Sequence, residues 1–208
     1  MKINEIFYSL QGEGKLVGLP TIFIRTTGCN LRCTYCDTTY AYHQGTEMAI
    51  EDIIHSIQKW RCKRVCITGG EPLLQENLMS LISSLSLDKY AISLETNGSV
   101  DISPFLSLEN LVISLDIKCP FSGMHHKMFF DNITFLRPFD QLKFVISDKK
   151  DFTYALSVIS QYKPLCPVIM QPSNRNFQDL AHWVLTSGQD IRFGVQLHKI
   201  IWGDKKGV

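Results

Sequence analysis

Short segments rich in β-branched and aromatic residues recur along the chain and are typical of β-strands. Several are apolar at nearly every position, as is usual for parallel strands that are buried on both faces. The pattern therefore predicts a mainly parallel sheet. The predicted strands are Thr21–Thr26, Val65–Thr68, Ala91–Glu95, Leu111–Leu115, Leu142–Ile146, Pro167–Gln171 and Ile191–Leu197.

Amphipathic segments lie between these predicted strands. In Glu51–Trp60, apolar residues recur at positions i, i+1, i+4 and i+7 and form one helical stripe. Asn77–Leu85, Asp151–Tyr162 and Phe177–Leu185 follow similar patterns. Strands that alternate with helices indicate right-handed βαβ units around a parallel sheet.

The length of the chain limits the number of such units. A complete barrel of eight units takes about 250 residues, whereas this chain has 208. We therefore expect residues 1–208 to form a single α/β domain, an incomplete TIM-like (β/α)6 barrel. Function in this architecture gathers at the carboxyl ends of the strands, where the sequence places Thr68–Pro72, Glu95–Gly98 and Asp116–Lys118.

Composition and charge narrow the class of protein. Apolar residues make up 45% of the chain, and the formal net charge is +1. This balance gives no electrostatic reason to expect nucleic acid or an anionic membrane as a partner. The first residues lack the features of a signal peptide, and no apolar run approaches the roughly 20 residues that span a bilayer. We therefore expect a cytoplasmic protein.

The cysteines point to metal or redox chemistry. Three of the seven, Cys29, Cys33 and Cys36, are crowded into one short segment, and disulfides are not expected in a reducing compartment. Three thiolates without a nearby fourth could hold an iron–sulfur cluster with one iron open to another ligand. The remaining four are expected to be small core residues: Cys62, Cys66, Cys119 and Cys166.

A zinc site is the alternative reading of the same cysteines. His43 would then be the fourth ligand. Structural zinc sites usually use two ligand pairs separated by a longer spacer, and that spacing is not found here.

The spacing CxxxCxxC, with Tyr35 directly before the last cysteine, resembles the cluster motif of the radical S-adenosylmethionine (SAM) superfamily. The segment Gly69–Pro72 resembles the GGE segment of that superfamily, in which Gly70 and Glu71 would lie near the SAM amino group. The resemblance implies a [4Fe–4S] cluster on the three cysteines and SAM on the open iron. It also implies that reductive cleavage of SAM yields a radical that abstracts hydrogen from a substrate.

Further segments resemble one family within this superfamily, the 7-carboxy-7-deazaguanine synthases. The matching segments include Ser9–Gly14 (SLQGEG), Cys36–Thr38, Glu95–Gly98 and the C-terminal Gln196–Lys199 (QLHK). The resemblance covers the chain from about Ile3 to its last residue. It implies conversion of 6-carboxy-5,6,7,8-tetrahydropterin to 7-carboxy-7-deazaguanine with loss of ammonia, a carbon–nitrogen lyase reaction on the way to queuosine.

The resemblance also implies a set of partners and a set of pterin contacts. The partners are Mg²⁺, an external electron donor such as flavodoxin or ferredoxin, and a second copy of the chain in a homodimer. Arg25 suits a bidentate contact with the pterin carboxylate. The positions that match substrate contacts are Leu10, Gln11, Gly12, Glu13, Arg25, Thr68, His198 and the C-terminal Val208.

Other positions match the cofactor contacts of the family. Thr38 matches the Mg²⁺ ligand, and a hydroxyl oxygen is a donor that this ion accepts. In the segment Asp116–Lys118 only the lysine matches the residues usual in the family. The positions that match SAM contacts are Tyr35, Asp37, Gly70, Glu71, Asp116, Ile117, Lys118, Gln171, Pro172, Ser173 and Asn174.

Two rival functions follow from the same cysteines. A glycyl-radical activating enzyme is similarly compact and uses the same spacing, but it would not need Arg25, the LQGEG segment or the QLHK ending. A metal-binding or electron-transfer module without catalysis would not need the GGEP segment.

Overall fold

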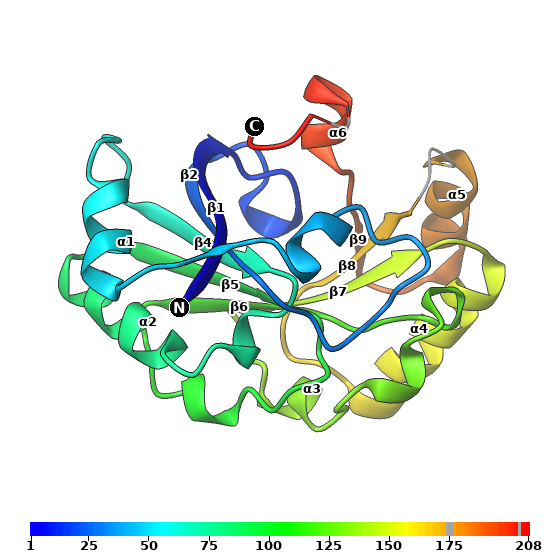
Figure 1. The fold of residues 1–208 in the computed structure, drawn as a ribbon. Coiled ribbons are helices and arrows are strands. Elements are labelled where there is room, and N and C mark those ends of the chain that lie inside the picture. Colours follow the sequence, from blue (N-terminus) through cyan, green and yellow to red (C-terminus); the bar gives the residue numbers. More distant parts are fainter. Residues whose placement is uncertain (174–176, 204) are drawn as a thin grey trace.

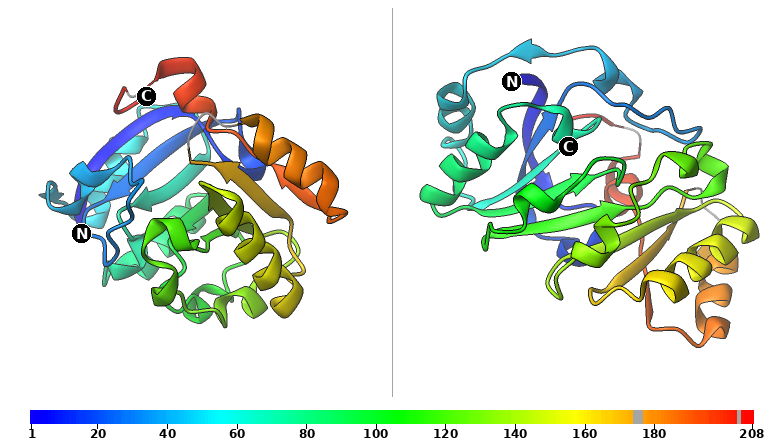
Figure 2. Two further views of the ribbon diagram at one scale, coloured as in Figure 1. Left: turned by 90° about the vertical axis from the view of Figure 1, so that its right-hand side faces the viewer. Right: turned by 90° about the horizontal axis from the view of Figure 1, so that it is seen from below.

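The computed structural model describes residues 1–173, 177–203 and 205–208. These residues form a nine-stranded sheet with the order β3-β1-β2-β4-β5-β6-β7-β8-β9 (Figure 1). From β2 to β9 every neighbouring pair of strands is parallel. The sheet is strongly curved, and the helices that connect its parallel strands lie on the convex side (Figure 2). The predicted α/β fold, an incomplete barrel of the radical SAM type, is confirmed.

The parallel strands lie where the apolar pattern predicts them. They are β2 (Pro20–Thr26), β4 (Arg64–Gly69), β5 (Ala91–Thr96), β6 (Leu111–Asp116), β7 (Gln141–Ile146), β8 (Val168–Pro172) and β9 (Ile191–Phe193). The last strand is shorter than predicted, because the chain leaves the sheet after Phe193 and the predicted strand residue Leu197 begins a helix.

Two antiparallel strands extend the sheet beyond β2. β1 (Lys2–Leu10) pairs with β2, and β3 (Thr46–Glu47) pairs with β1. The sequence pattern did not predict them, because β1 mixes polar and apolar residues and β3 is only two residues long. The β1–β2 connection carries the short helical turn Gly14–Leu16.

The helices between the parallel strands agree with the amphipathic segments to within a few residues. They are α1 (Ile50–Ile57), α2 (Leu78–Leu87), α4 (Lys149–Tyr162) and α5 (Phe177–Ser187). Two shorter helices were not predicted, α3 (Asn132–Phe135) and α6 (Leu197–Trp202). Between β5 and β6 the structure has only the 3₁₀ turn Ser103–Phe105, so the helical repeat is irregular there.

The alternation of side chains along each strand divides the sheet into two chemically different faces. In β7, Leu142, Phe144 and Ile146 belong to the hydrophobic core. Lys143, between them, lines the interior pocket instead. Since successive strand residues point to opposite faces, the helices cover an apolar face, and the concave face is free to carry polar groups.

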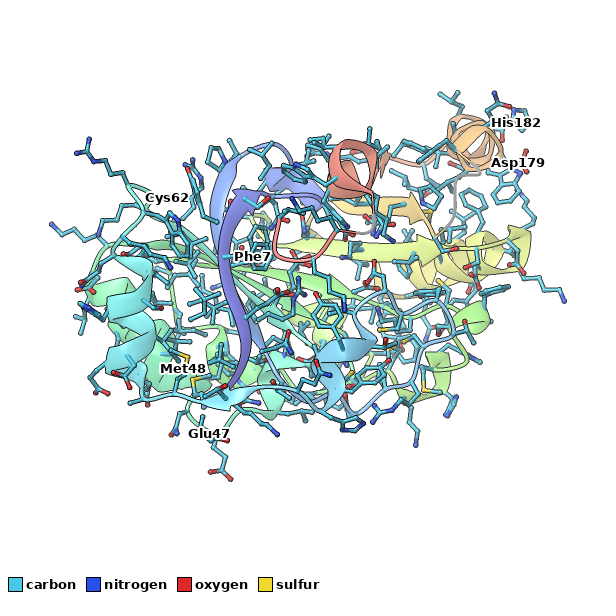
Figure 3. The ribbon with its side chains drawn as sticks, turned by 45° about the horizontal axis from the view of Figure 1, so that its top comes forward. Phe7, Glu47, Met48, Cys62, Asp179 and His182 are labelled. Atoms are coloured by element: carbon cyan, nitrogen blue, oxygen red, sulfur yellow. The ribbon has the colours of Figure 1, made fainter. Side chains whose placement is uncertain are left out.

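The four scattered cysteines are buried, as predicted: Cys62, Cys66, Cys119 and Cys166. Cys62 lies at the amino end of the sheet, where its thiol donates to the carbonyl of Pro20 (Figure 3). Among the described residues, no helix is long and apolar enough to cross a membrane.

The interior strand β7 provides a test of the core. Phe144 is fully buried, so Phe144→Ala should lower the free energy of unfolding by about 3–5 kcal/mol through lost burial and the cavity left behind. Leu165→Ala is the control, because Leu165 is 77% exposed and should change stability by less than about 0.5 kcal/mol. Urea denaturation measures both, and equal losses would contradict this packing.

Candidate active site

A pocket of about 340 Å³ opens at the carboxyl ends of the parallel strands. Its walls come from segments far apart in the sequence: the end of β1, the loop that carries the three clustered cysteines, the ends of β4 to β8 and the C-terminal segment. The location agrees with the prediction from the polar segments at the strand ends.

Cys29, Cys33 and Cys36 all line this pocket. Their loop is tied to the rest of the chain by the Thr34 hydroxyl, which donates to the carbonyl of Phe121 at 2.7 Å. Burial raises the pKa of the Cys29 thiol, and it raises that of Cys33 to about 11. Burial therefore favours the thiol form of both groups, and a bound metal centre would favour their thiolate forms.

The zinc alternative finds no support in the geometry. Among residues 1–173, 177–203 and 205–208, no three His, Cys, Asp or Glu side chains are placed to hold one metal ion. His43 is exposed and contacts the ring of Tyr42 instead. Cysteines that bind a cluster attach to different irons and need not converge on a single point.

The GGEP segment packs directly against the start of the cysteine loop, and the backbone N–H of Glu71 donates to the carbonyl of Gly28 at 2.7 Å. A side chain at Gly70 would collide with the backbone, because an added Cβ would lie 2.1 Å from the carbonyl oxygen of Gly28. Only glycine therefore permits this close approach between the end of β4 and the cysteine loop.

Glu71 is fully buried and binds protein donors. Its carboxylate accepts from the backbone N–H of Asn97 at 2.6 Å, the Thr96 hydroxyl at 2.8 Å and the backbone N–H of Leu73 at 3.1 Å. Burial raises its pKa to about 7 against these hydrogen bonds. In this structure Glu71 joins the end of β4 to the end of β5.

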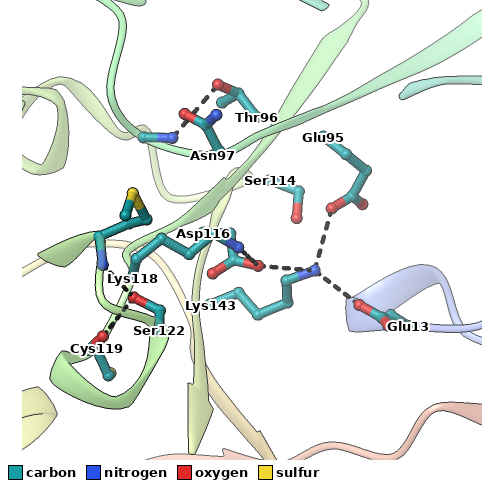
Figure 4. Close-up of polar contacts among 12 residues, drawn as sticks. Glu13, Glu95, Thr96, Asn97, Ser114, Asp116, Lys118, Cys119, Ser122 and Lys143 are labelled. Atoms are coloured by element: carbon teal, nitrogen blue, oxygen red, sulfur yellow. Dashed lines mark hydrogen bonds and ion pairs between the residues drawn. The ribbon is translucent and has the colours of Figure 1, made fainter. Parts of the chain in front are cut away.

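The floor of the pocket is a buried cluster of charges, which we call the floor cluster: Lys143, Glu13, Glu95 and Asp116 (Figure 4). The Lys143 ammonium lies 2.7 Å from Glu13 and 3.5 Å from Glu95 and from Asp116. Register explains part of the contact, because Asp116 on β6 and Lys143 on β7 are paired across the sheet. Glu13 comes from the loop after β1.

The floor cluster keeps Glu13 and Lys143 ionised despite burial. Burial alone would raise the pKa of Glu13, but the Lys143 charge and hydrogen bonds from Lys143 and Gln196 hold that pKa well below its usual value. Burial would likewise lower the pKa of Lys143, and the charges of Glu13, Glu95 and Asp116 instead raise it. For Glu95 burial prevails and the pKa is raised.

Arg25 lies on another wall of the pocket. Its Nε–H donates to Glu5 at 2.7 Å, and Glu5 also accepts from the Tyr40 hydroxyl at 2.9 Å. The guanidinium carbon is 5.7 Å from the ring centre of Phe7, which lies on β1 (Figure 3). No described residue binds the two terminal nitrogens of Arg25, so they can meet a ligand carboxylate in the bidentate geometry.

The C-terminal segment closes the pocket against the loop after β1. Gln196 donates to Glu13 at 2.7 Å, and the backbone N–H of Leu197 donates to the carbonyl of Gly12 at 2.8 Å. The His198 ring packs so closely on Gly12 that a Cβ there would lie 2.1 Å from its Nδ1. These contacts explain why the LQGEG and QLHK segments, at opposite ends of the chain, both carry glycine or polar residues.

One further contact joins the C-terminal segment to the cysteine loop. Lys199 lies 2.8 Å from Asp37, which in turn accepts a hydrogen bond from the Thr38 hydroxyl at 3.0 Å. Val208 also lines the pocket. Helix α6 therefore connects the loop after β1, which is predicted to bind the pterin, with the cysteine loop, which is predicted to bind the cluster and SAM.

Among the described residues, three that line the pocket carry a buried polar atom without a hydrogen-bond partner: the Tyr35 hydroxyl and two acceptors. Asp116 Oδ1 and Gln171 Oε1 are buried and unpaired in the part of the chain that the structure describes. Both residues line the pocket. Because unpaired buried acceptors are costly, they indicate a ligand that brings N–H or O–H groups.

The structure brings most of the predicted site residues together. Those that line the pocket are Cys29, Cys33, Cys36, Leu10, Gln11, Gly12, Glu13, Arg25, Thr68, His198, Val208, Tyr35, Asp37, Thr38, Gly70, Asp116, Lys118, Gln171 and Ser173. Glu71, Ile117 and Pro172 are buried in the structure around it. Asn174 lies outside the described residues.

Sequence reasoning missed Lys143, Gln196 and Lys199 as members of the site. A signal existed for Lys143, because a lysine inside the otherwise apolar run Leu142–Ile146 needs a buried partner. No comparable signal existed for Lys199, since its contact with Asp37 depends on how the C-terminal segment folds back.

The sequence is similar to a family model and to full-length proteins of known name. Residues 23–129 match the family model of the radical SAM superfamily. A 7-carboxy-7-deazaguanine synthase from Thermoplasma acidophilum is 35% identical, over the full length of both chains. A protein of the same name from Methanospirillum hungatei is 40% identical, over 97% of this chain and 85% of its own length.

A solved structure has a similar fold. The structure of QueE from Escherichia coli superposes with a TM-score of 0.76 and 23% identity, covering 95% of this chain and 94% of that one. From the family model and the full-length relatives we conclude that the chain belongs to the radical SAM superfamily and, within it, to the 7-carboxy-7-deazaguanine synthase family.

Proposed function

We propose that the protein is a 7-carboxy-7-deazaguanine synthase, which contracts the ring of 6-carboxy-5,6,7,8-tetrahydropterin and releases ammonia. The names of its full-length relatives support this function. The observation that carries the proposal is one pocket that holds three cysteines, an arginine with free terminal nitrogens and a buried ionised carboxylate. A planar pterin with a carboxylate at one end needs such groups on different walls.

The pocket fits the cofactors that the superfamily implies. Three cysteines on one loop suit a [4Fe–4S] cluster with one open iron. The close approach at Gly70 holds the GGEP segment against the cysteine loop, and Asp116 and Gln171 offer unpaired acceptors to the N–H and O–H groups of SAM. When bound, the cluster and SAM supply the radical that takes hydrogen from the substrate.

The protein groups bind and orient the pterin. The terminal nitrogens of Arg25 would bind its carboxylate. The ionised Glu13 is an acceptor only, so it would select the N–H edge of the aminopyrimidinone ring. Lys143 and Gln196 hold Glu13 in place, and α6 with His198 would keep water from the reacting ring.

Several finer features belong to the same proposal. We propose that residues 1–208 act as one radical SAM core domain, as a carbon–nitrogen lyase and as a homodimer in the cytoplasm. Thr38 would bind Mg²⁺ together with substrate oxygens and water. The electron would come from an external carrier such as flavodoxin or ferredoxin, and the product would lead to queuosine.

The two rival functions account for less of the pocket. A glycyl-radical activating enzyme must admit a protein backbone, whereas here α6 lies across the loop after β1. A module that only stores a cluster would have no use for the unpaired acceptors Asp116 and Gln171.

Anaerobic turnover tests the proposal directly. The reconstituted protein is mixed with the carboxytetrahydropterin, SAM, Mg²⁺ and a strong reductant, and the deazaguanine product is detected by mass spectrometry. Product that requires SAM but does not consume it would support the function, and Cys33→Ala is the inactive control. SAM cleavage without product would reject the substrate, and the absence of both cleavage and product would reject the enzyme.

Arg25→Ala should weaken pterin binding specifically. Loss of a charge-assisted contact worth about 1.5–3 kcal/mol should raise the pterin KM by roughly 10- to 100-fold and leave the SAM Kd unchanged. Steady-state kinetics and SAM titration measure the two effects. Arg61→Ala, at an exposed arginine, is the control, and equal losses of pterin and SAM affinity would contradict the role of Arg25.

Lys143→Met should destabilise the floor cluster. It leaves Glu13, Glu95 and Asp116 without their shared cation, and removal of one partner from a buried ion pair costs about 3–5 kcal/mol. Urea denaturation should show this loss, and adding Glu13→Gln should recover part of it. Lys150→Met, at an exposed lysine, should have almost no effect. An unchanged free energy of unfolding in Lys143→Met would show that Lys143 and Glu13 are not ionised as described.

A further inference from the structure

The sulfur of Cys29 has two N–H donors from the protein. The backbone N–H of Leu31 donates to Cys29 Sγ at 3.4 Å, a local contact within the cysteine loop. The side-chain amide of Asn97 donates to the same sulfur at 3.7 Å. Asn97 follows β5, so this second contact depends on the fold and not on the loop alone.

The orientation of the Asn97 amide is fixed by its other partners. Its Oδ1 accepts from the Ser99 hydroxyl at 2.6 Å and from the Ser99 backbone N–H at 3.0 Å. Its Nδ2 also donates to Asn30 Oδ1 at 3.1 Å. With both donors of Ser99 on the oxygen side, the NH₂ group must face Cys29 and Asn30.

The position of Asn97 is equally constrained. Its backbone N–H donates to the buried carboxylate of Glu71 at 2.6 Å, and the residue is only 7% exposed. It lines the pocket beside Cys29. The Asn97 side chain is therefore fixed beside the sulfur of a cysteine that would bind the cluster, and a surface turn alone would not require this burial.

We propose that Asn97 is a positioning residue for the iron–sulfur cluster and that its amide raises the reduction potential of the cluster by donating a hydrogen bond to the Cys29 sulfur. Reduction adds one electron, delivered by an external one-electron carrier, and changes no covalent bond. The added negative charge is spread over the cluster and its sulfur ligands. A donor at the sulfur therefore stabilises the reduced form more than the oxidised form.

The inference rests on membership of the radical SAM superfamily and not on the identity of the substrate. Charged groups act elsewhere in the loop, since Lys118 and Asp116 influence Cys33. Glu71 acts near Cys29, but it adds negative charge and supplies no donor. Of the three clustered cysteines, Cys29 is the one whose sulfur would lose a hydrogen bond if the Asn97 amide were removed.

Two substitutions distinguish the N–H donor of Asn97, which contacts Cys29, from its side-chain oxygen, which stabilises the turn at Ser99. Asn97→Asp keeps an oxygen to accept from Ser99 and removes the donor, although it adds a negative charge. Asn97→Ser removes the donor without adding charge and retains a hydroxyl oxygen for the turn. Asn30→Ala is the matched control, because it removes the other acceptor of the same amide and leaves the contact with Cys29.

The measurement is a redox titration of the anaerobically reconstituted protein without pterin or SAM, followed by electron paramagnetic resonance, with iron and sulfide analysis of each variant. Asn97→Ser should shift the one-electron equilibrium about tenfold towards the oxidised cluster, which is a potential about 59 mV lower. Asn97→Asp should shift it further in the same direction, and Asn30→Ala should leave it unchanged.

Three outcomes would overturn the inference. Wild-type potentials in both Asn97 variants would show that the contact with sulfur has no electronic effect. An equal shift in Asn30→Ala would assign the effect to the loop as a whole. Loss of iron from both Asn97 variants would assign a purely structural role to the residue. Because no pterin is present, failure of the proposed substrate would leave this result unaffected.

Discussion

The site depends on one ammonium group that is buried among three carboxylates. Lys143 on β7 meets Asp116 on β6, Glu95 on β5 and Glu13 on the loop after β1. Each carboxylate alone would be costly to bury. Asp116 also pairs with Lys118 at 3.0 Å, and Lys143 is the cation that all three carboxylates share. The floor cluster therefore fixes the strand ends relative to the loop after β1, and it sets the charge of the pocket floor.

The C-terminal segment extends this arrangement across the mouth of the pocket. Gln196 shares Glu13 with Lys143, and Lys199 binds Asp37 beside the last cysteine of the loop. The floor, the loop after β1 and the cysteine loop thus form one connected set of polar contacts. A change in any of them would be expected to disturb the binding of both cofactor and substrate.

Much of the fold could be predicted from the sequence, because the parallel strands are apolar runs and α1, α2, α4 and α5 have apolar stripes. The antiparallel β1 was missed because it mixes polar and apolar residues. The site was predicted through its cysteines and glycines. Lys143 was missed although it interrupts an apolar strand, and Lys199 could not be found, because its partner Asp37 is distant in sequence.

The most direct test of the central claim is a crystal structure of the protein loaded with cluster, SAM and the carboxytetrahydropterin. If the floor cluster orients the substrate, the pterin carboxylate will lie on Arg25, and the N–H edge of the aminopyrimidinone ring will lie on Glu13, with Lys143 still bound to that carboxylate. A pterin bound the other way round, or a Glu13 side chain turned away from Lys143 and from the ring, would contradict the account.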